Sequence, residues 1–125
     1  MNWSGRGKVR ARAIDGGLEL IVDEITTQAR VYKPLVYEFF RKEFPIRPRW
    51  GDFEVEILVE YLGEAPGLDL DNLAKALLDA LKGHVFFDDA QIARLLCERI
   101  AGGRDRIRLR AVRREKLSQA GERDG

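Results

Sequence analysis

Residues 68–95 read LDLDNLAKALLDALKGHVFFDDAQIARL. Two pairs of aspartates enclose a helical pattern in this stretch: Asp69 with Asp71, and Asp88 with Asp89. Leucines and alanines recur between the two pairs at spacings of three and four residues, which is typical of a helix that buries one side. We therefore expect a helix over about 70–81, followed by Gly83 as a C-terminal cap.

Strand patterns flank this helix on both sides. Residues 52–62, DFEVEILVEYL, alternate between apolar and mostly acidic side chains, as a half-buried strand does. Residues 92–100 and 104–112 predict two further strands joined by a glycine turn. Residues 8–24 predict a β-hairpin, because the DGG sequence at their centre tolerates the positive φ of a tight turn.

A second helix is expected between the hairpin and the 52–62 strand. Thr26 or Thr27 offers an N-cap, and the helix should run to about Phe44, where prolines follow. Its apolar residues form two adjacent rows: Val31, Leu35 and Phe39, and Tyr32, Val36 and Phe40. This broad stripe suits packing against a sheet, and a contribution to a dimer interface is the alternative.

The order of elements, β, β, α, β, α, β, β, predicts an α+β fold. A chain of 125 residues suits one compact domain, residues 1–125. We expect a small sandwich in which two helices pack on one face of a mixed β-sheet. The polar tail at about 115–125 is expected to fray.

Composition narrows the class of protein. Hydrophobic residues make up 45% and charged residues 34% of the chain, which suits a soluble globular protein. The single cysteine, Cys97, excludes an intrachain disulfide and a zinc–cysteine cluster. There is no apolar run of the roughly 20 residues that a membrane span needs, and the N-terminus lacks the apolar core of a signal peptide. We expect a cytoplasmic protein without a membrane partner.

Charge is distributed unevenly although the net charge is only +1. Residues 1–50 carry ten basic and six acidic side chains, residues 51–100 carry four and eleven, and residues 101–125 carry eight and four. An acidic centre between basic segments suits a metal site that acts on a polyanion, and an unevenly charged surface is the structural alternative.

The aspartates around the central helix are candidate ligands of a hard cation. Side chains at i and i+2 of an extended segment point the same way, so Asp69 and Asp71 can converge. Mg²⁺ prefers oxygen ligands and keeps waters and phosphate oxygens in its shell, and Asp88 or Asp89 would supply a third carboxylate. Lys75, one helical turn after Asp71, would place an ammonium beside a bound phosphate.

Each of these residues also has an ordinary structural explanation. An aspartate at the start of a helix caps it and complements the helix dipole. Lys75 can form a surface ion pair with Asp71 or with Asp79 at i, i+4 spacing. The residues alone therefore support two interpretations, a Mg²⁺ and phosphate site or helix capping with surface ion pairs.

A longer motif favours the first interpretation. The segments DLDNLAK (69–75), DAL (79–81) and DDAQI (88–92), with Gly83 between them, resemble the signature of the RusA family of Holliday junction resolvases. The resemblance combines several fixed spacings and is far more specific than one DxD. The N-terminus departs from the family pattern, because it lacks the usual first strand and the Pro-Trp-Pro-like segment after it.

The resemblance implies a RusA-like homodimeric endonuclease that cuts four-way DNA junctions with Mg²⁺, for which Mn²⁺ can substitute. Such enzymes act in DNA recombination and repair by paired symmetrical nicks that leave 5′-phosphates. The matching catalytic residues are Asp69, Asp71, Lys75 and Asp89. The three aspartates match metal ligands, and Asp88 is the adjacent acid. Asn72 and Gln91 match supporting positions, Asn72 by orienting the aspartates; an exposed loop residue is the alternative for Gln91.

Basic rows predict contacts to DNA phosphates. The last strand carries Arg104, Arg106, Arg108 and Arg110, and the first hairpin carries Arg10 and Arg12 after Arg6 and Lys8. A solvated outer face that discourages aggregation is the alternative for each row. Trp3, Phe86 and Phe87 are candidates for stacking on bases, with a core role as the alternative for the phenylalanines.

Three functions from different classes follow. The first is a Mg²⁺-dependent junction endonuclease. The second is a non-catalytic dimer that binds branched DNA without cutting it. The third is a metal-dependent nucleotide hydrolase, which would have a closed pocket and no basic surface across a dimer.

Overall fold

The computed structural model describes residues 2–114, so the tail predicted to fray lies outside the described residues. The regular elements are β1 (Val9–Ile14), β2 (Gly17–Asp23), α1 (Tyr32–Lys42), β3 (Phe53–Tyr61), α2 (Leu70–Leu81), β4 (Ile92–Ala101) and β5 (Arg106–Arg113). Two short 3-10 turns, η1 (Ala29–Val31) and η2 (Asp89–Gln91), precede α1 and β4. The predicted single-domain α+β fold is confirmed. No helix in residues 2–114 is long and apolar enough to cross a membrane.

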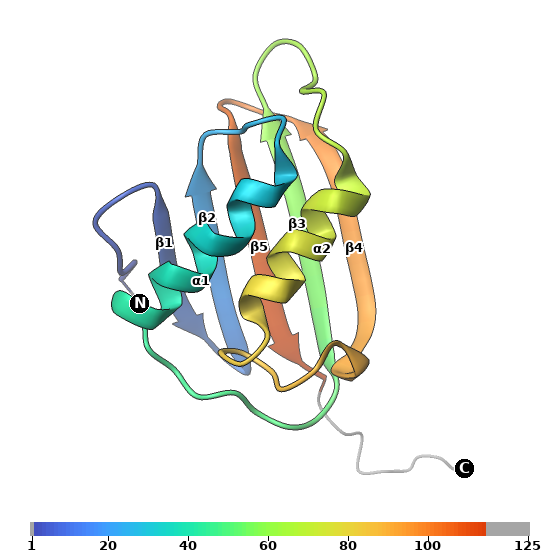
Figure 1. Cartoon of the computed structure of the whole chain (residues 1–125). Helices are drawn as coiled ribbons and strands as arrows, with labels where there is room; N and C mark the ends of the chain where they lie inside the picture. Colours follow the sequence, from blue (N-terminus) through green and yellow to red (C-terminus); the bar gives the residue numbers. More distant parts are fainter. Residues whose placement is uncertain (1, 115–125) are drawn as a thin grey trace.

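The strands form one mixed sheet in the order β1-β2-β5-β3-β4. All neighbours are antiparallel except β3 and β4, which are parallel and joined through α2, because parallel neighbours need a crossover connection (Figure 1). The last strand lies at the centre of the sheet. The turn after β4 therefore passes the end of β3, where the Asp105 carboxylate accepts a hydrogen bond from the Leu62 N–H at 2.9 Å.

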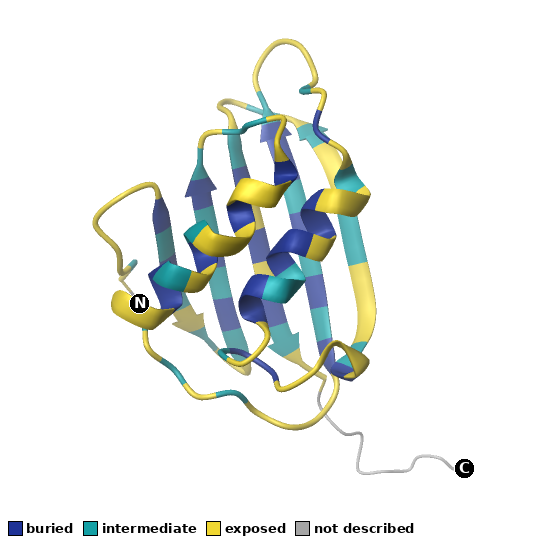
Figure 2. Ribbon diagram, viewed as in Figure 1, coloured by how far each residue is buried: buried dark blue, intermediate teal, exposed yellow. Residues whose placement is uncertain are grey.

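Both helices lie on one face of the sheet and bury their apolar sides against it (Figure 1). Their outward sides are exposed, whereas the strand positions beneath them are buried (Figure 2). The row of α1 formed by Tyr32, Val36 and Phe40 is at most 2% exposed. This row is therefore part of the intramolecular core and not of a dimer interface.

The start of α1 differs from the prediction. Neither Thr26 nor Thr27 caps the helix, which begins at Tyr32 after the turn η1. Pro34 explains the late start, because proline lacks an N–H and its ring clashes with the carbonyl four residues earlier. A proline is tolerated in the first turn of a helix and not in its interior. The hydroxyl of Thr26 instead accepts a hydrogen bond from the Gln28 N–H at 3.3 Å and bends the chain into η1.

Candidate active site

The first acidic pair lies at the N-terminal end of α2. Asp69 is the N-cap, and its Oδ1 accepts hydrogen bonds from the backbone N–H groups of Asp71 at 2.9 Å and Asn72 at 3.2 Å. Asp71 lies in the first turn, where a carboxylate complements the helix dipole. Asp69 therefore acts as a helix cap, as the structural alternative predicts. Both cap hydrogen bonds are made to Oδ1 of its exposed carboxylate.

Three of the four predicted catalytic residues line one groove, which we call the groove of Asp71. It has a volume of about 490 Å³, runs between α2 and the start of β4, and is lined by Asp71, Lys75 and Asp89 among others. Asp71 and Lys75 share one side of α2, and Asp89 comes from η2. A neighbouring hollow of about 410 Å³ is lined by Asp69, Asp71 and Arg99. Asp71 therefore belongs to both depressions.

The candidate charges are not used in ion pairs. Within residues 2–114, no salt bridge involves any of the four predicted catalytic residues, Asp69, Asp71, Lys75 and Asp89. Asp79 pairs instead with Lys33 of α1, its Oδ2 lying 3.9 Å from Nζ. The predicted alternative of i, i+4 ion pairs on α2 is therefore wrong for this face of the helix.

The second acidic pair is held by a buried glutamine. Gln91 is only 8% exposed, so the alternative of an exposed loop residue is wrong. Its Oε1 accepts hydrogen bonds from the N–H groups of Phe87 at 2.7 Å and Asp88 at 3.1 Å. Its Nε2 donates to the carbonyls of Arg49 at 2.9 Å and Gly51 at 2.8 Å. Gln91 thus joins the turn that carries the aspartates to the segment before β3.

The two aspartates of this turn have different environments. Asp88 caps η2 by accepting a hydrogen bond from the Ala90 N–H, and its other oxygen lies 3.4 Å from Lys82 Nζ. Asp89 is exposed and lines the groove of Asp71. The structure therefore gives Asp88 a local structural role and leaves the Asp89 carboxylate available.

The carboxylates fit Mg²⁺ only with help from other ligands. In residues 2–114, no group of three His, Cys, Asp or Glu side chains is close enough to hold a metal ion by itself. Mg²⁺ in proteins is commonly held by one or two carboxylates together with waters and substrate phosphates. Hard oxygen donors from Asp71 and Asp89 in one groove match that chemistry. The binding of one Mg²⁺ ion by Asp69, Asp71 and Asp89 together stays a prediction.

Asn72 and one arginine complete the surroundings of the acids. The contact of Asn72 with Asp69 comes from its backbone N–H, and its side chain lines the groove between α1 and α2. Arg99, which the sequence did not single out, donates from Nη2 to the Leu68 carbonyl at 2.8 Å beside Asp69. Arg99 lies two positions after Cys97 in β4, so both side chains point to the helix side of the sheet. This spacing was the signal in the sequence that could have identified Arg99.

The predicted DNA-binding rows lie on the open face of the sheet, opposite the helices. Strands of opposite charge alternate there, so that arginines of β1 and β5 flank acids of β2 and β3. The ion pairs are Arg10–Asp23, Arg12–Glu19, Arg104–Asp23, Arg106–Glu60 and Arg108–Glu60, and Arg110 lies between Glu19 and Glu56 in register. Phosphates would have to compete with these carboxylates. A DNA-binding role for the rows stays a prediction.

The aromatic candidates separate into core and surface. Phe86 is fully buried, as its core alternative requires. Phe87 is 39% exposed and stacks on Trp50, with ring centroids 4.1 Å apart. Trp3 packs under the Arg12 guanidinium at 4.6 Å. The exposed Trp50, next to the turn that carries Asp89, was not identified from the sequence.

These features define a small α+β protein with an exposed acidic site beside a lysine on one helix. A family model described as endodeoxyribonuclease RusA matches residues 25–111, which is more than half of the chain. The chain therefore belongs to the RusA family, and the resemblance seen in its motif is confirmed. Membership implies a Holliday junction resolving endonuclease that acts on branched DNA. No curated protein matches the chain.

Proposed function

We propose that this protein is a Mg²⁺-dependent endodeoxyribonuclease that resolves four-way DNA junctions by paired symmetrical nicks in DNA recombination and repair. One observation carries the proposal. In a chain of the RusA family, Asp71, Lys75 and Asp89 line a single exposed groove and are not consumed by ion pairs within the described residues. Hydrogen bonds and an ion pair account for Asp69 and Asp88, whereas the carboxylates of Asp71 and Asp89 and the ammonium of Lys75 have no salt-bridge partner in the described residues.

The residues of the groove divide the work of phosphodiester hydrolysis. Asp71 and Asp89 would hold Mg²⁺ together with waters and a phosphate oxygen of the DNA, and Asp69 would join them only after its side chain turns toward the groove. When bound, Mg²⁺ neutralises charge on the scissile phosphate and activates the attacking water. Lys75 supports the charge that builds on the phosphoryl oxygens. Hydrolysis breaks the P–O3′ bond, so the products carry a 5′-phosphate and a 3′-hydroxyl that a ligase can rejoin.

Two residues act by positioning the others. The Asp69 cap holds the first turn of α2, from which Asp71 and Lys75 project. The four hydrogen bonds of Gln91 hold the turn from which Asp89 reaches the groove. Such placement matters because a small displacement of a reacting group lowers the rate steeply.

A homodimer follows from the symmetry of the substrate. A four-way junction presents two equivalent strands, and a two-fold dimer places one site at each of them. The buried row of α1 is not available for this contact. The dimer surface therefore has to be formed by other parts of the chain.

The test is cleavage of a synthetic four-way junction in Mg²⁺, with a linear duplex of the same sequence as the control substrate. Wild type is expected to nick the junction symmetrically. Asp71→Asn is expected to bind the junction and not cut it, and Asp15→Asn, a charge-matched change in the exposed β1–β2 turn, is expected to cut like wild type. Tight binding without cutting by wild type, in Mg²⁺ and in Mn²⁺, would instead identify a branched-DNA binding protein. Cleavage of nucleotides without junction binding would identify a nucleotide hydrolase.

Metal binding has a test that does not depend on activity. Because a ligand that binds only the folded state stabilises it, Mg²⁺ is expected to raise the thermal unfolding midpoint of wild type. The increase should be smaller in Asp71→Asn and unchanged in Asp15→Asn. An equal increase in all three proteins would place the metal elsewhere.

A further inference from the structure

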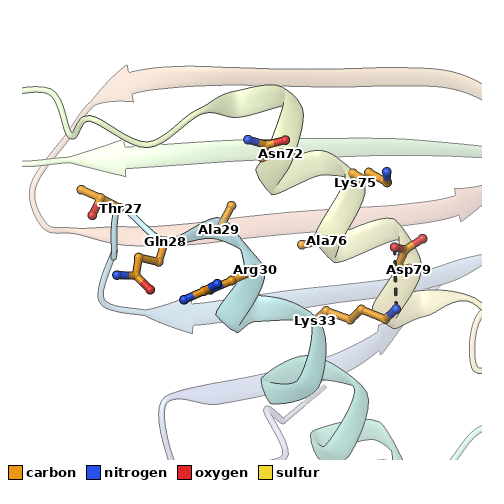
Figure 3. Close-up of a pocket in the computed structure, with 9 residues that line it drawn as sticks. All are labelled: Thr27, Gln28, Ala29, Arg30, Lys33, Asn72, Lys75, Ala76 and Asp79. Atoms are coloured by element: carbon orange, nitrogen blue, oxygen red, sulfur yellow. Dashed lines mark ion pairs between the residues drawn. The ribbon is translucent and has the colours of Figure 1, made fainter.

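A second groove lies on the other side of Lys75, between the start of α1 and the side of α2 (Figure 3). It has a volume of about 460 Å³ and is open to solvent. Arg30 of η1 and Lys33 of α1 form one wall, and Asn72 and Lys75 form the other. Because Lys75 and Asp79 also line the groove of Asp71, the two depressions meet at these two side chains.

The electrostatic balance of this second groove is positive. Three cations line it, Arg30, Lys33 and Lys75, against the single carboxylate of Asp79. In residues 2–114 neither Arg30 nor Lys75 has a salt-bridge partner. Figure 3 shows Lys33 reaching across to Asp79, and the pair is long, 3.9 Å, with the lysine side chain 58% exposed. An exposed pair of this kind is weak, so Lys33 can move to a stronger anion at little cost.

The open face of the sheet lacks this property. Most of its arginines pair with carboxylates, as Arg106 does with Glu60 at 2.9 Å and Arg10 with Asp23 at 2.8 Å, and Arg110 lies in register between two glutamates. A phosphate that binds there must compete with these carboxylates, whereas Arg30 has no salt-bridge partner among the described residues.

The shape of the groove also suits a polymer backbone. Its floor contains Ala29 and Ala76, which are small and buried, so a chain of phosphates and sugars can approach the helices closely. The side-chain amides of Gln28 and Asn72 line it as neutral hydrogen-bond donors. A strand that leaves the groove of Asp71 across Lys75 would enter this second groove directly.

We propose that the groove of Arg30 and Lys33 binds phosphates of the cleaved DNA strand, next to the phosphate at which the strand is cut. Lys75 contacts the scissile phosphate, and Arg30 and Lys33 contact phosphates further along the same strand. This assignment rests on the proposed function, because it places the cleaved phosphate at Lys75. It adds two phosphate-binding residues that lie outside the catalytic motif.

The experiment measures the salt dependence of junction binding with the full chain, in Ca²⁺ so that no cutting occurs. The variant Arg30→Gln/Lys33→Gln is compared with Arg41→Gln/Lys42→Gln, a charge-matched pair at the other end of α1 whose cations contact Glu38. Each lost phosphate contact should lower the slope of log K against log salt by about 1. The groove variant should therefore lose about 2 from the slope and bind on the order of tens of times more weakly at about 0.1 M salt, while the control stays near wild type.

Two further proteins make the result decisive. Arg30→Lys/Lys33→Arg keeps both charges and should keep the wild-type slope. Lys33→Gln alone should lower the slope by about 1, half as much as the double variant, and it replaces the double variant if that protein unfolds. An unchanged slope in the groove variants, or equal losses in the Arg41/Lys42 control, would overturn this inference and leave the proposed function intact. Failure of wild type to bind a junction at all would overturn both.

Discussion

The buried side chain of Gln91 leads to the sharpest prediction for stability. Its four hydrogen bonds, between 2.7 and 3.1 Å long, are made to backbone groups of two separate segments. Replacement by methionine keeps the length and flexibility of the side chain and removes all four bonds. Each bond contributes a net of about 1 kcal/mol, and unsatisfied buried partners add to the loss. Gln91→Met should therefore lower the free energy of unfolding by about 4 kcal/mol, a large part of the roughly 5–15 kcal/mol of a typical domain.

The assay is urea denaturation followed by far-UV circular dichroism, with Gln28→Met as the matched control. Gln28 is exposed, so the same chemical change there should stay within about 0.5 kcal/mol of wild type. Cleavage by Gln91→Met should also fall at temperatures where the protein is folded, because the turn that carries Asp89 is no longer fixed. A loss of stability below about 1 kcal/mol would refute the reasoning, since the two segments would then be held together by other contacts.

Three further predictions test the surroundings of the site. Asp69→Ala should cost about 1 kcal/mol of unfolding free energy by removing the cap of α2, whereas Asp69→Asn keeps the cap and should lose cleavage; urea denaturation and nicking assays separate these two roles. The hydrogen bond from Arg106 holds the pKa of Glu60 below its ordinary value of 4.5, so its stabilisation is complete above pH 4.5 and is lost as the pH falls further. The difference in unfolding free energy between wild type and Glu60→Gln should therefore shrink below pH 4.5, and a constant difference would contradict this ion pair. Burial raises the pKa of the Cys97 thiol above 9.0, with a smaller contribution from the charge of Asp71. Native protein should thus react slowly with iodoacetamide at about pH 8, and faster when Mg²⁺ or Asp71→Asn removes that charge; identical rates would argue against metal at Asp71.

Local patterns in the chain were sufficient to predict most of the elements. The alternation in residues 52–62 corresponds to β3, and the helical spacing after Asp69 corresponds to α2. Burial on one side imposes a period on residues that are close in the chain, so such patterns can be read without a structure. The family was recognisable for the same reason, because its motif lies within residues 69–92. The late start of α1 is also encoded locally, by Pro34.

Contacts between distant parts of the chain decided the rest. The last strand lies between β2 and β3, and this position pairs the arginines of β5 with acids on both sides. Gln91 is buried because the segment before β3 packs against it, some forty positions earlier in the chain. Arg30 and Lys33 come beside Lys75 only because η1 and α1 pack against α2. No local period carries this information, since the free energy of each of these contacts depends on where the rest of the chain has folded.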